Sequence, residues 1–122
     1  MFKVHQGGTF LPVELQSPDY VFGQEKIPMV SASATRAADA SAIHLSLANT
    51  SPTQAVTLRV KLAGFTPKSV AGRVLTATEM TAHNTFEAPN AVQPAAFAGS
   101  TVEGDTLEVK LPAKSVVVLA LR

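Results

Sequence analysis

The sequence contains no cysteine and no tryptophan, and it has only one tyrosine, Tyr20. Without cysteine there can be no disulfide framework, no thiolate metal site and no cysteine nucleophile. Sugar-binding modules usually stack the rings of their ligands on exposed tryptophan or tyrosine side chains, because these offer large aromatic faces. The shortage of both weighs against a sugar-binding module, although six phenylalanines remain.

The chain also lacks a strong charge of either sign and any long apolar run. It carries ten basic and nine acidic residues, which are interspersed and leave a net charge of +1. This balance does not indicate nucleic acid or an anionic membrane as a partner. No window approaches the roughly 18 uninterrupted apolar residues of a transmembrane helix. A length of 122 residues, of which 46% are hydrophobic, is typical of one domain with its own core.

Alternation of apolar and polar residues is the main pattern in the chain. Segments that alternate strictly predict strands with one buried and one exposed face. Ser115–Leu121 is apolar on both faces, which is typical of a central strand. Asn49–Pro52 has the pattern of a hairpin loop. Many short strands joined by turns predict an all-β fold, an antiparallel β-sandwich. The strictly alternating segments are Ala42–Asn49, Ala55–Leu62 and Thr106–Leu111, and the weaker ones are Thr9–Leu15, Met29–Arg36 and Arg73–Ala77.

Helix is predicted only at the start of the chain. Met1–Gln6 precede Gly7 and Gly8, and glycine at this position is typical of the C-terminal end of a helix. Six residues do not form a stable helix alone, so we expect this segment to be the end of a longer helix. His5 would then interact with the negative end of the helix dipole.

The segment Met80–Val92 brings together a histidine, two asparagines, a phenylalanine and a glutamate, and a second glutamate, Glu79, precedes it. One interpretation pairs His83 with Glu79 or Glu87 as acid and base. That chemistry requires the groups to lie within hydrogen-bond reach of one another in a cleft. The spacing of these residues in the sequence does not establish such a geometry.

The interpretation that we favour for this segment is an ordered loop. Asn84 and Asn90 can form Asx-turns with the backbone. Phe86 can insert into the core, and Pro89 can stiffen the exit. Loops of a β-sandwich need such ties more often than they carry chemistry.

No metal site and no cofactor site is predicted. His5, His44 and His83 are isolated, without a ligand spacing such as H-x-x-x-H. His44 falls on the polar face of its strand, where we expect it to contact solvent or a neighbouring strand. The sequence has no G-x-S-x-G elbow around a serine and no phosphate-binding glycine pattern.

Four segments stand out, in this order: FKVHQGGTFLPVELQSPDY, AIHLSLANTSP, GRVLTATEMTAHNTFEAPNAVQPAAF and LEVKLPAKSVVVLALR. Together they resemble the C-terminal region of bacterial α-L-arabinofuranosidases of glycoside hydrolase family fifty-one. The most distinctive parts are the string AHNTFEAPNAVQP and the ending L-P-x-x-S-V-V-V-L. The resemblance covers nearly the whole chain.

The resemblance implies a jelly-roll β-sandwich joined to a catalytic (β/α)8 barrel. Enzymes of this family remove terminal non-reducing α-L-arabinofuranosyl groups from arabinoxylan and arabinan, with retention of configuration. Two barrel glutamates act as acid/base and as nucleophile. The acid/base glutamate of the family follows an asparagine, and this chain has no Asn-Glu pair. No catalytic residue is therefore assigned here, and the chain is far shorter than the about 250 residues of a barrel.

The resemblance also divides the chain. Residues 1–8 correspond to the tail of the last barrel helix and a linker, and residues 9–122 correspond to the sandwich. The implied partner is the barrel, and we expect the loop that contains His83, Asn84, Phe86 and Glu87 to lie at the interface with it. In the family, a strand from the start of the whole enzyme also joins the sandwich. Without that strand and the barrel, we expect an unpaired sheet edge and an uncovered apolar face.

The sequence therefore favours an accessory, structural domain of an arabinofuranosidase that is not catalytic alone. Two alternatives stay open. One is a carbohydrate-binding module for hemicellulose, and the other is a domain that associates with further copies of itself through the exposed edge. The resemblance leaves both the cytoplasm and the periplasm of a bacterium open as the location.

Overall fold

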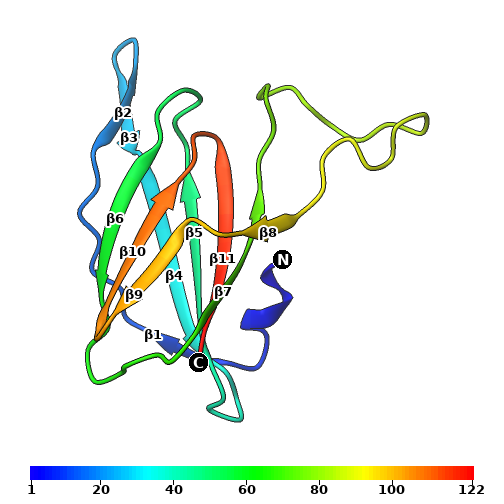
Figure 1. Ribbon diagram of the computed structural model, residues 1–122. Coiled ribbons are helices and arrows are strands. Elements are labelled where there is room, and N and C mark those ends of the chain that lie inside the picture. Colours follow the sequence, from blue (N-terminus) through cyan, green and yellow to red (C-terminus); the bar gives the residue numbers. More distant parts are fainter.

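Short antiparallel strands make up nearly all of the regular structure of this protein. The computed structural model describes residues 1–122 (Figure 1). The strands follow a four-residue 3-10 helix, η1 (Phe2–His5), and no helix is long and apolar enough to cross a membrane. The strands are β1 (Thr9–Leu11), β2 (Asp19–Phe22), β3 (Glu25–Pro28), β4 (Val30–Arg36), β5 (Ile43–Asn49), β6 (Val56–Lys61), β7 (Val70–Leu75), β8 (Ala95–Phe97), β9 (Ser100–Glu103), β10 (Thr106–Leu111) and β11 (Ser115–Leu121).

The strands form two sheets that enclose the core, and a separate hairpin. The larger sheet has six strands in the order β1-β4-β5-β11-β7-β8, and the smaller sheet has three in the order β6-β10-β9. The hairpin of β2 and β3 projects from one end of the molecule (Figure 1). Every paired strand is antiparallel to its neighbour. The predicted all-β antiparallel sandwich is therefore confirmed.

The alternating sequence places one apolar row of each central strand between the two sheets. In β10 and β11 every second side chain is fully buried. Burying one such side chain stabilises the fold by about 1.5–3 kcal/mol. Together with residues of β4, β5 and β6 they form a single core. The members of the β10 and β11 rows are Leu107, Val109, Leu111, Val117, Leu119 and Leu121.

β11 is a central strand, as its sequence predicts. It pairs with β5 along one edge and with β7 along the other. Its inner row faces the core, and on its outer face Val118 is also only 7% exposed. An uninterrupted apolar strand is thus explained by burial on both faces.

The prediction that Asn49–Pro52 forms a hairpin loop is wrong. β5 belongs to the six-stranded sheet and β6 to the three-stranded sheet, so this segment crosses from one sheet to the other. Alternation cannot distinguish the two cases, because a hairpin and a crossing both join two amphipathic strands over a short distance.

Several strand boundaries also differ from the predictions. The first strand ends at Leu11 instead of Leu15, since Pro12 has no N–H with which to extend the ladder. The signal predicted at Arg73–Ala77 belongs to β7, which begins earlier, at Val70. β2, β3 and β8 were not predicted, because their residues are mostly exposed and lack a buried alternating row.

Candidate docking surface

The outer face of the six-stranded sheet, which is turned away from the core, carries the candidate site. It takes the residues that alternate with the buried row of each strand. Thr35 of β4, His44 of β5, Ala120 of β11 and Ala71 of β7 lie side by side in register on this face. Most of these side chains are small. The shape of this surface is therefore set by the segments that lie on the sheet, which are η1 and the loop between β7 and β8.

The helix η1 lies on this face and is held there by His5. The ring Nδ1 lies 2.8 Å from Thr35 Oγ1, and the ring Nε2 lies 2.5 Å from Ser46 Oγ. Each hydroxyl can donate or accept, so both nitrogens of a neutral ring are satisfied. Ser46 is only 5% exposed. His5 therefore fixes η1 on the sheet through these two hydroxyls, and its interaction with the dipole of a longer helix stays a prediction.

His44 lies close to the same helix. Its ring centroid is 6.2 Å from that of His5, in an edge-to-face arrangement. Its Nδ1 is buried and has no hydrogen-bond partner. The pKa of His5 is lowered from its usual value, first by burial and then by repulsion from His44. The predicted contact of His44 with a neighbouring strand thus does not include a hydrogen bond of this nitrogen.

A groove of about 400 Å³ separates η1 from β7. Lys3 and Val4 line it from the helix, and Ala71 and Arg73 line it from the strand. His44 and Arg122 complete its walls, together with small residues of β7 and β11. No sequence pattern marks this groove, because its basic residues come from three separate parts of the chain.

A second hollow, of about 350 Å³, lies near the end of β7. Leu75 and Val116 contribute from the sheet, and Met80 and Val92 contribute from the two arms of the long loop between β7 and β8. Glu79 also lines this hollow. The loop and the sheet therefore form one continuous surface.

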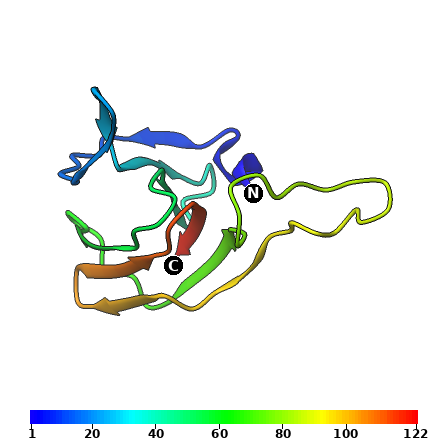
Figure 2. The same cartoon turned by 90° about the horizontal axis from the view of Figure 1, so that it is seen from above.

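The loop 76–94 projects far from the sheet (Figure 2). Asn84 ties its two arms together: its Nδ2 donates to the carbonyl oxygen of Val92 at 3.0 Å, and its Oδ1 accepts from the amide of Val92 at 2.7 Å. At the tip, the amide of Ala88 donates to Thr85 Oγ1 at 3.0 Å, and the amide of Thr85 donates to the carbonyl oxygen of Ala88 at 3.2 Å. The favoured interpretation, an ordered loop, agrees with these contacts, although Asn84 spans the loop and does not form a local Asx-turn.

Phe86 contradicts its predicted place in the core. Its side chain is fully exposed, with a relative accessibility of 103%. The hydrogen bonds of Asn84 and Thr85 close the loop on itself, and Phe86 lies at the tip of this projecting loop and does not reach the core.

The structure does not assemble an acid and base from the loop. The Nδ1 of His83 lies 2.8 Å from the carbonyl oxygen of Thr81, and no hydrogen bond or ion pair joins His83 to Glu79 or Glu87. All of these side chains are exposed. The chain also contains no group of three His, Cys, Asp or Glu side chains that could hold a metal ion.

Further apolar side chains are exposed on β1, on the segment that follows it and on the β2–β3 hairpin. They include Phe22, which is 76% exposed, and Phe10, which is 71% exposed. The uncovered apolar sheet face that the sequence predicts stays a prediction. The exposed side chains of these segments are Phe10, Val13, Leu15, Val21, Phe22 and Ile27.

Comparison with known proteins identifies the family. The family model described as the α-L-arabinofuranosidase C-terminal domain matches residues 1–115. An intracellular exo-α-L-arabinofuranosidase from Bacteroides ovatus is 41% identical over 123 residues, which cover 100% of this chain and 24% of that protein.

Solved structures agree with this match. A family 51 arabinofuranosidase from Xanthomonas axonopodis superimposes with a TM-score of 0.95 at 38% identity, over 99% of this chain and 24% of the other. A family 51 α-L-arabinofuranosidase from Bifidobacterium longum, at 24% identity, superimposes with a TM-score of 0.75 over 88% of this chain and 21% of the other. This chain therefore spans about a quarter of the length of these relatives. It belongs to the family of α-L-arabinofuranosidase C-terminal domains.

Proposed function

We propose that this chain is the accessory domain of an α-L-arabinofuranosidase and packs against a catalytic (β/α)8 barrel. The complete enzyme hydrolyses terminal non-reducing α-L-arabinofuranosyl groups of arabinoxylan and arabinan, with retention of configuration. The barrel supplies the acid/base and the nucleophile, and this chain supplies a rigid surface against which the barrel rests. The match of the whole chain to about a quarter of longer arabinofuranosidases supports this role.

The observation that carries the docking proposal is the full exposure of Phe86 on a loop that is internally tied. Covering such a side chain stabilises a complex by about 2 kcal/mol. His83, Asn84 and Glu87 lie on the same tip and are exposed polar groups, as found at the rim of an interface. We assign these four residues to the interface with the barrel.

The position of the N-terminus supports the same assignment. Met1 lines the groove between η1 and β7, and both views place it over the outer face of the six-stranded sheet (Figures 1 and 2). The family model describes a C-terminal domain, so the catalytic portion of such an enzyme precedes residue 1 in the chain. The barrel therefore joins the domain at the outer face of the six-stranded sheet, on which the loop 76–94 also lies.

A fusion protein tests this function. The C-terminal quarter of the Bacteroides ovatus relative is replaced by this chain, and hydrolysis of 4-nitrophenyl α-L-arabinofuranoside is measured. We expect the fusion to hydrolyse the substrate and the 122-residue chain alone to be inactive. Turnover by the purified chain alone, retained through every purification step, contradicts the accessory role.

Phe86→Ala in the same fusion tests the contact directly. We expect a lower thermal midpoint of the fusion, because the variant loses about 2 kcal/mol of apolar contact. Phe22→Ala is the matched control, since Phe22 is also an exposed phenylalanine but lies on the β2–β3 hairpin. Equal midpoints for the two variants contradict the assignment of Phe86 to the interface.

A further inference from the structure

We propose that the groove between η1 and β7 binds carboxylate side chains of the catalytic domain, so that the two domains are joined by charge as well as by apolar contact. This inference rests on the proposed function, because it names what the partner must present. It adds a second contact, distinct from the loop around Phe86, and a chemistry for it.

The charged side chains around the groove are all basic. Lys3, Arg73 and Arg122 line it, and no Asp or Glu does. The terminal oxygen of Arg122 already accepts hydrogen bonds from the backbone amides of Lys68 and Ser69, at 2.6 and 2.9 Å. Three basic side chains thus face one groove without an acidic side chain among them.

Neither Lys3 nor Arg73 has a strong partner within the chain. Neither belongs to any of the three ion pairs. The one hydrogen bond of the Arg73 guanidinium is a long contact of 3.5 Å to the carbonyl oxygen of Pro94. Both side chains are exposed. Their donors are therefore free to bind an acceptor that approaches from outside.

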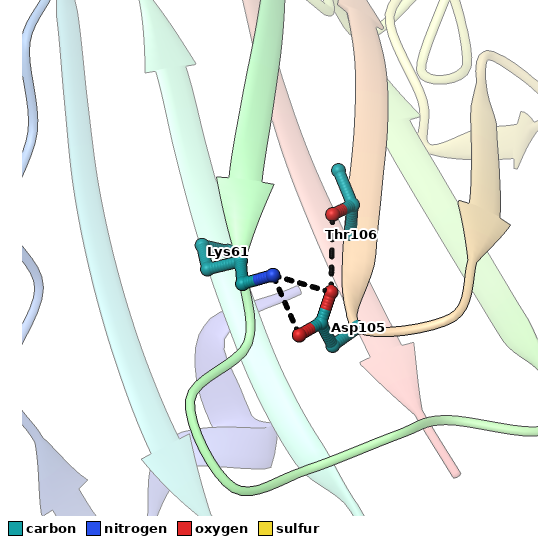
Figure 3. Close-up of polar contacts among 3 residues, drawn as sticks. All are labelled: Lys61, Asp105 and Thr106. Carbon is teal, nitrogen blue, oxygen red and sulfur yellow. Dashed lines mark hydrogen bonds and ion pairs between the residues drawn. The ribbon is translucent and has the colours of Figure 1, made fainter.

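The ion pairs of the protein lie elsewhere. Lys26 pairs with Asp19 on the β2–β3 hairpin, at 2.9 Å. On the three-stranded sheet, Lys61 Nζ donates to Asp105 Oδ1 at 2.7 Å, and Thr106 Oγ1 donates to the same oxygen at 3.3 Å (Figure 3). Lys26 and Lys61 on those surfaces pair with acids of the chain, whereas Lys3 and Arg73 in the groove do not.

The rest of the groove suits a carboxylate side chain that enters over the sheet. Ala71, Ala120 and Gly72 form part of its floor and walls, so backbone and small side chains leave room for the approach. A guanidinium binds a carboxylate through two parallel hydrogen bonds, which makes Arg73 a better anchor than Lys3.

The occupant follows from the position of Met1. Because Met1 lines this groove, the polypeptide that precedes the domain in its relatives ends at the groove itself. A surface of the catalytic domain therefore covers the groove, and its matching chemistry is acidic.

A double charge-neutralising variant tests the inference. Lys3→Gln/Arg73→Gln is made in the fusion with the Bacteroides ovatus catalytic portion and in the isolated chain. We expect the thermal midpoint of the fusion to fall by several degrees at low salt, and the difference to shrink at about 1 M NaCl, where charges are screened within about 3 Å. The midpoint of the isolated chain should stay unchanged within about one degree, because neither side chain has an ion-pair partner in it.

The matched control is Arg59→Gln/Lys110→Gln, which removes the same charge from the outer face of the three-stranded sheet. We expect this control to change the fusion and the isolated chain equally. If the groove variant changes both proteins equally as well, the groove is not an interface and the inference is wrong.

Cysteine labelling gives a second readout, since the chain has no cysteine of its own. Ala71→Cys places a thiol in the groove, and Thr57→Cys places one on the three-stranded sheet; both residues are exposed. We expect maleimide to label the groove thiol at least about tenfold more slowly in the fusion than in the isolated chain, because the partner excludes the reagent. The thiol at position 57 should react equally in both, and cysteines of the catalytic portion are subtracted with the unmodified fusion.

The outcomes separate this inference from the proposed function. An active fusion in which the groove thiol is labelled at the rate of the isolated chain overturns the groove contact and leaves the accessory role standing. An inactive fusion with a freely labelled groove overturns both. Binding of sodium glucuronate to the isolated chain, measured by calorimetry and lost in Lys3→Gln/Arg73→Gln, would assign the groove to an acidic sugar and would also overturn the inference.

Discussion

The rings of His5 and His44 lie 6.2 Å apart between centroids, with their planes at 77°. One ring belongs to η1 and the other to β5, so the contact joins the helix to the sheet. The neighbouring ring of His44 disfavours protonation of His5. Burial is the larger cause and His44 the smaller cause of the lowered pKa of His5. The attachment of η1 therefore depends on pH.

We predict that the protein loses stability as the pH falls from about 7.5 to about 5.5. The pKa of His5 is lower in the folded chain than the usual value of 6.5, so the unfolded chain binds more protons in this range. The stabilising contribution is complete above the unfolded pKa and is lost as the pH falls towards the folded one. Urea denaturation across this range should show a shallower pH dependence for His5→Gln than for the unsubstituted chain.

The two carboxylates whose pKa is lowered affect the stability in a different pH range. The pKa of Asp39 is lowered mainly by hydrogen bonds from Ser41, and that of Asp105 mainly by the hydrogen bond from Lys61. Their contributions are present above a pH of about 4 and are lost only below it. An equal slope for His5→Gln and the unsubstituted chain between pH 7.5 and 5.5 would therefore contradict the role of His5.

Gly72 and Leu119 offer a test of the core packing. A Cβ at Gly72 would lie 2.6 Å from Leu119 Cδ2 and 3.1 Å from Phe97 Cδ1. We expect Gly72→Ala to cost about 1–3 kcal/mol by overpacking and Leu119→Ala to cost about 2–5 kcal/mol by leaving a cavity. The double variant should cost less than the sum, because removing the leucine makes room for the methyl group.

Urea denaturation of the four proteins measures this coupling. Leu107→Ala is the control partner, since Leu107 is also fully buried but is not among the atoms nearest to Gly72. Combined with Gly72→Ala, it should give an additive loss. If the losses in free energy of unfolding are additive for Gly72→Ala with Leu119→Ala as well as with Leu107→Ala, the contact between Gly72 and Leu119 is relieved in some other way.

The sequence predicted the elements whose side chains alternate around the core. The bounds of β10 and β11 agree with the predicted ones, because every second residue of each strand is apolar and buried. β2 and β3 were missed for the opposite reason. All but one of their side chains are exposed, so burial does not impose a pattern on them.

The surface was less predictable, because its contacts join distant residues. His5 binds Thr35 and Ser46, which are 30 and 41 residues away, and no local pattern marks such pairs. Phe86 was placed in the core on its aromatic character alone. It lies instead at the exposed tip of a loop whose two arms are joined by Asn84 and Val92.

Asn49 is predicted to be essential for the crossing between the two sheets. It is 3% exposed, and its Nδ2 donates to the carbonyl oxygens of Gln54 and Pro112 at 2.8 and 2.9 Å. Its Oδ1 accepts from the amide of Ser51 at 3.0 Å. We expect Asn49→Ala to cost about 2–4 kcal/mol, because three hydrogen bonds are lost and buried groups are left without partners.

Asn49→Asp separates the contributions of the donors and the acceptor. The aspartate keeps an acceptor for Ser51 but loses both donors and brings a negative charge towards two carbonyl oxygens. We expect it to be at least as destabilising as Asn49→Ala in urea denaturation at neutral pH. A milder effect of Asn49→Asp would show that the bond to Ser51 is the important one.

Asn84 should control the order of the loop without affecting the stability of the sandwich. Both of its hydrogen bonds go to Val92, and the whole segment around it is exposed. We expect Asn84→Ala to raise hydrogen exchange at the amide of Val92 by about fivefold or more, since each bond contributes about 1 kcal/mol.

Asn90→Ala is the matched control for this effect, because Asn90 lies on the same loop but its side chain makes no hydrogen bond. The amide of Val117, in the central strand, should exchange at the same rate in all three proteins. In the fusion, Asn84→Ala should lower the thermal midpoint in the same direction as Phe86→Ala, because a loose loop presents the ring in many orientations and pays the ordering entropy on docking. If exchange at Val92 becomes faster but the thermal midpoint of the fusion does not change, the order of the loop does not contribute to docking.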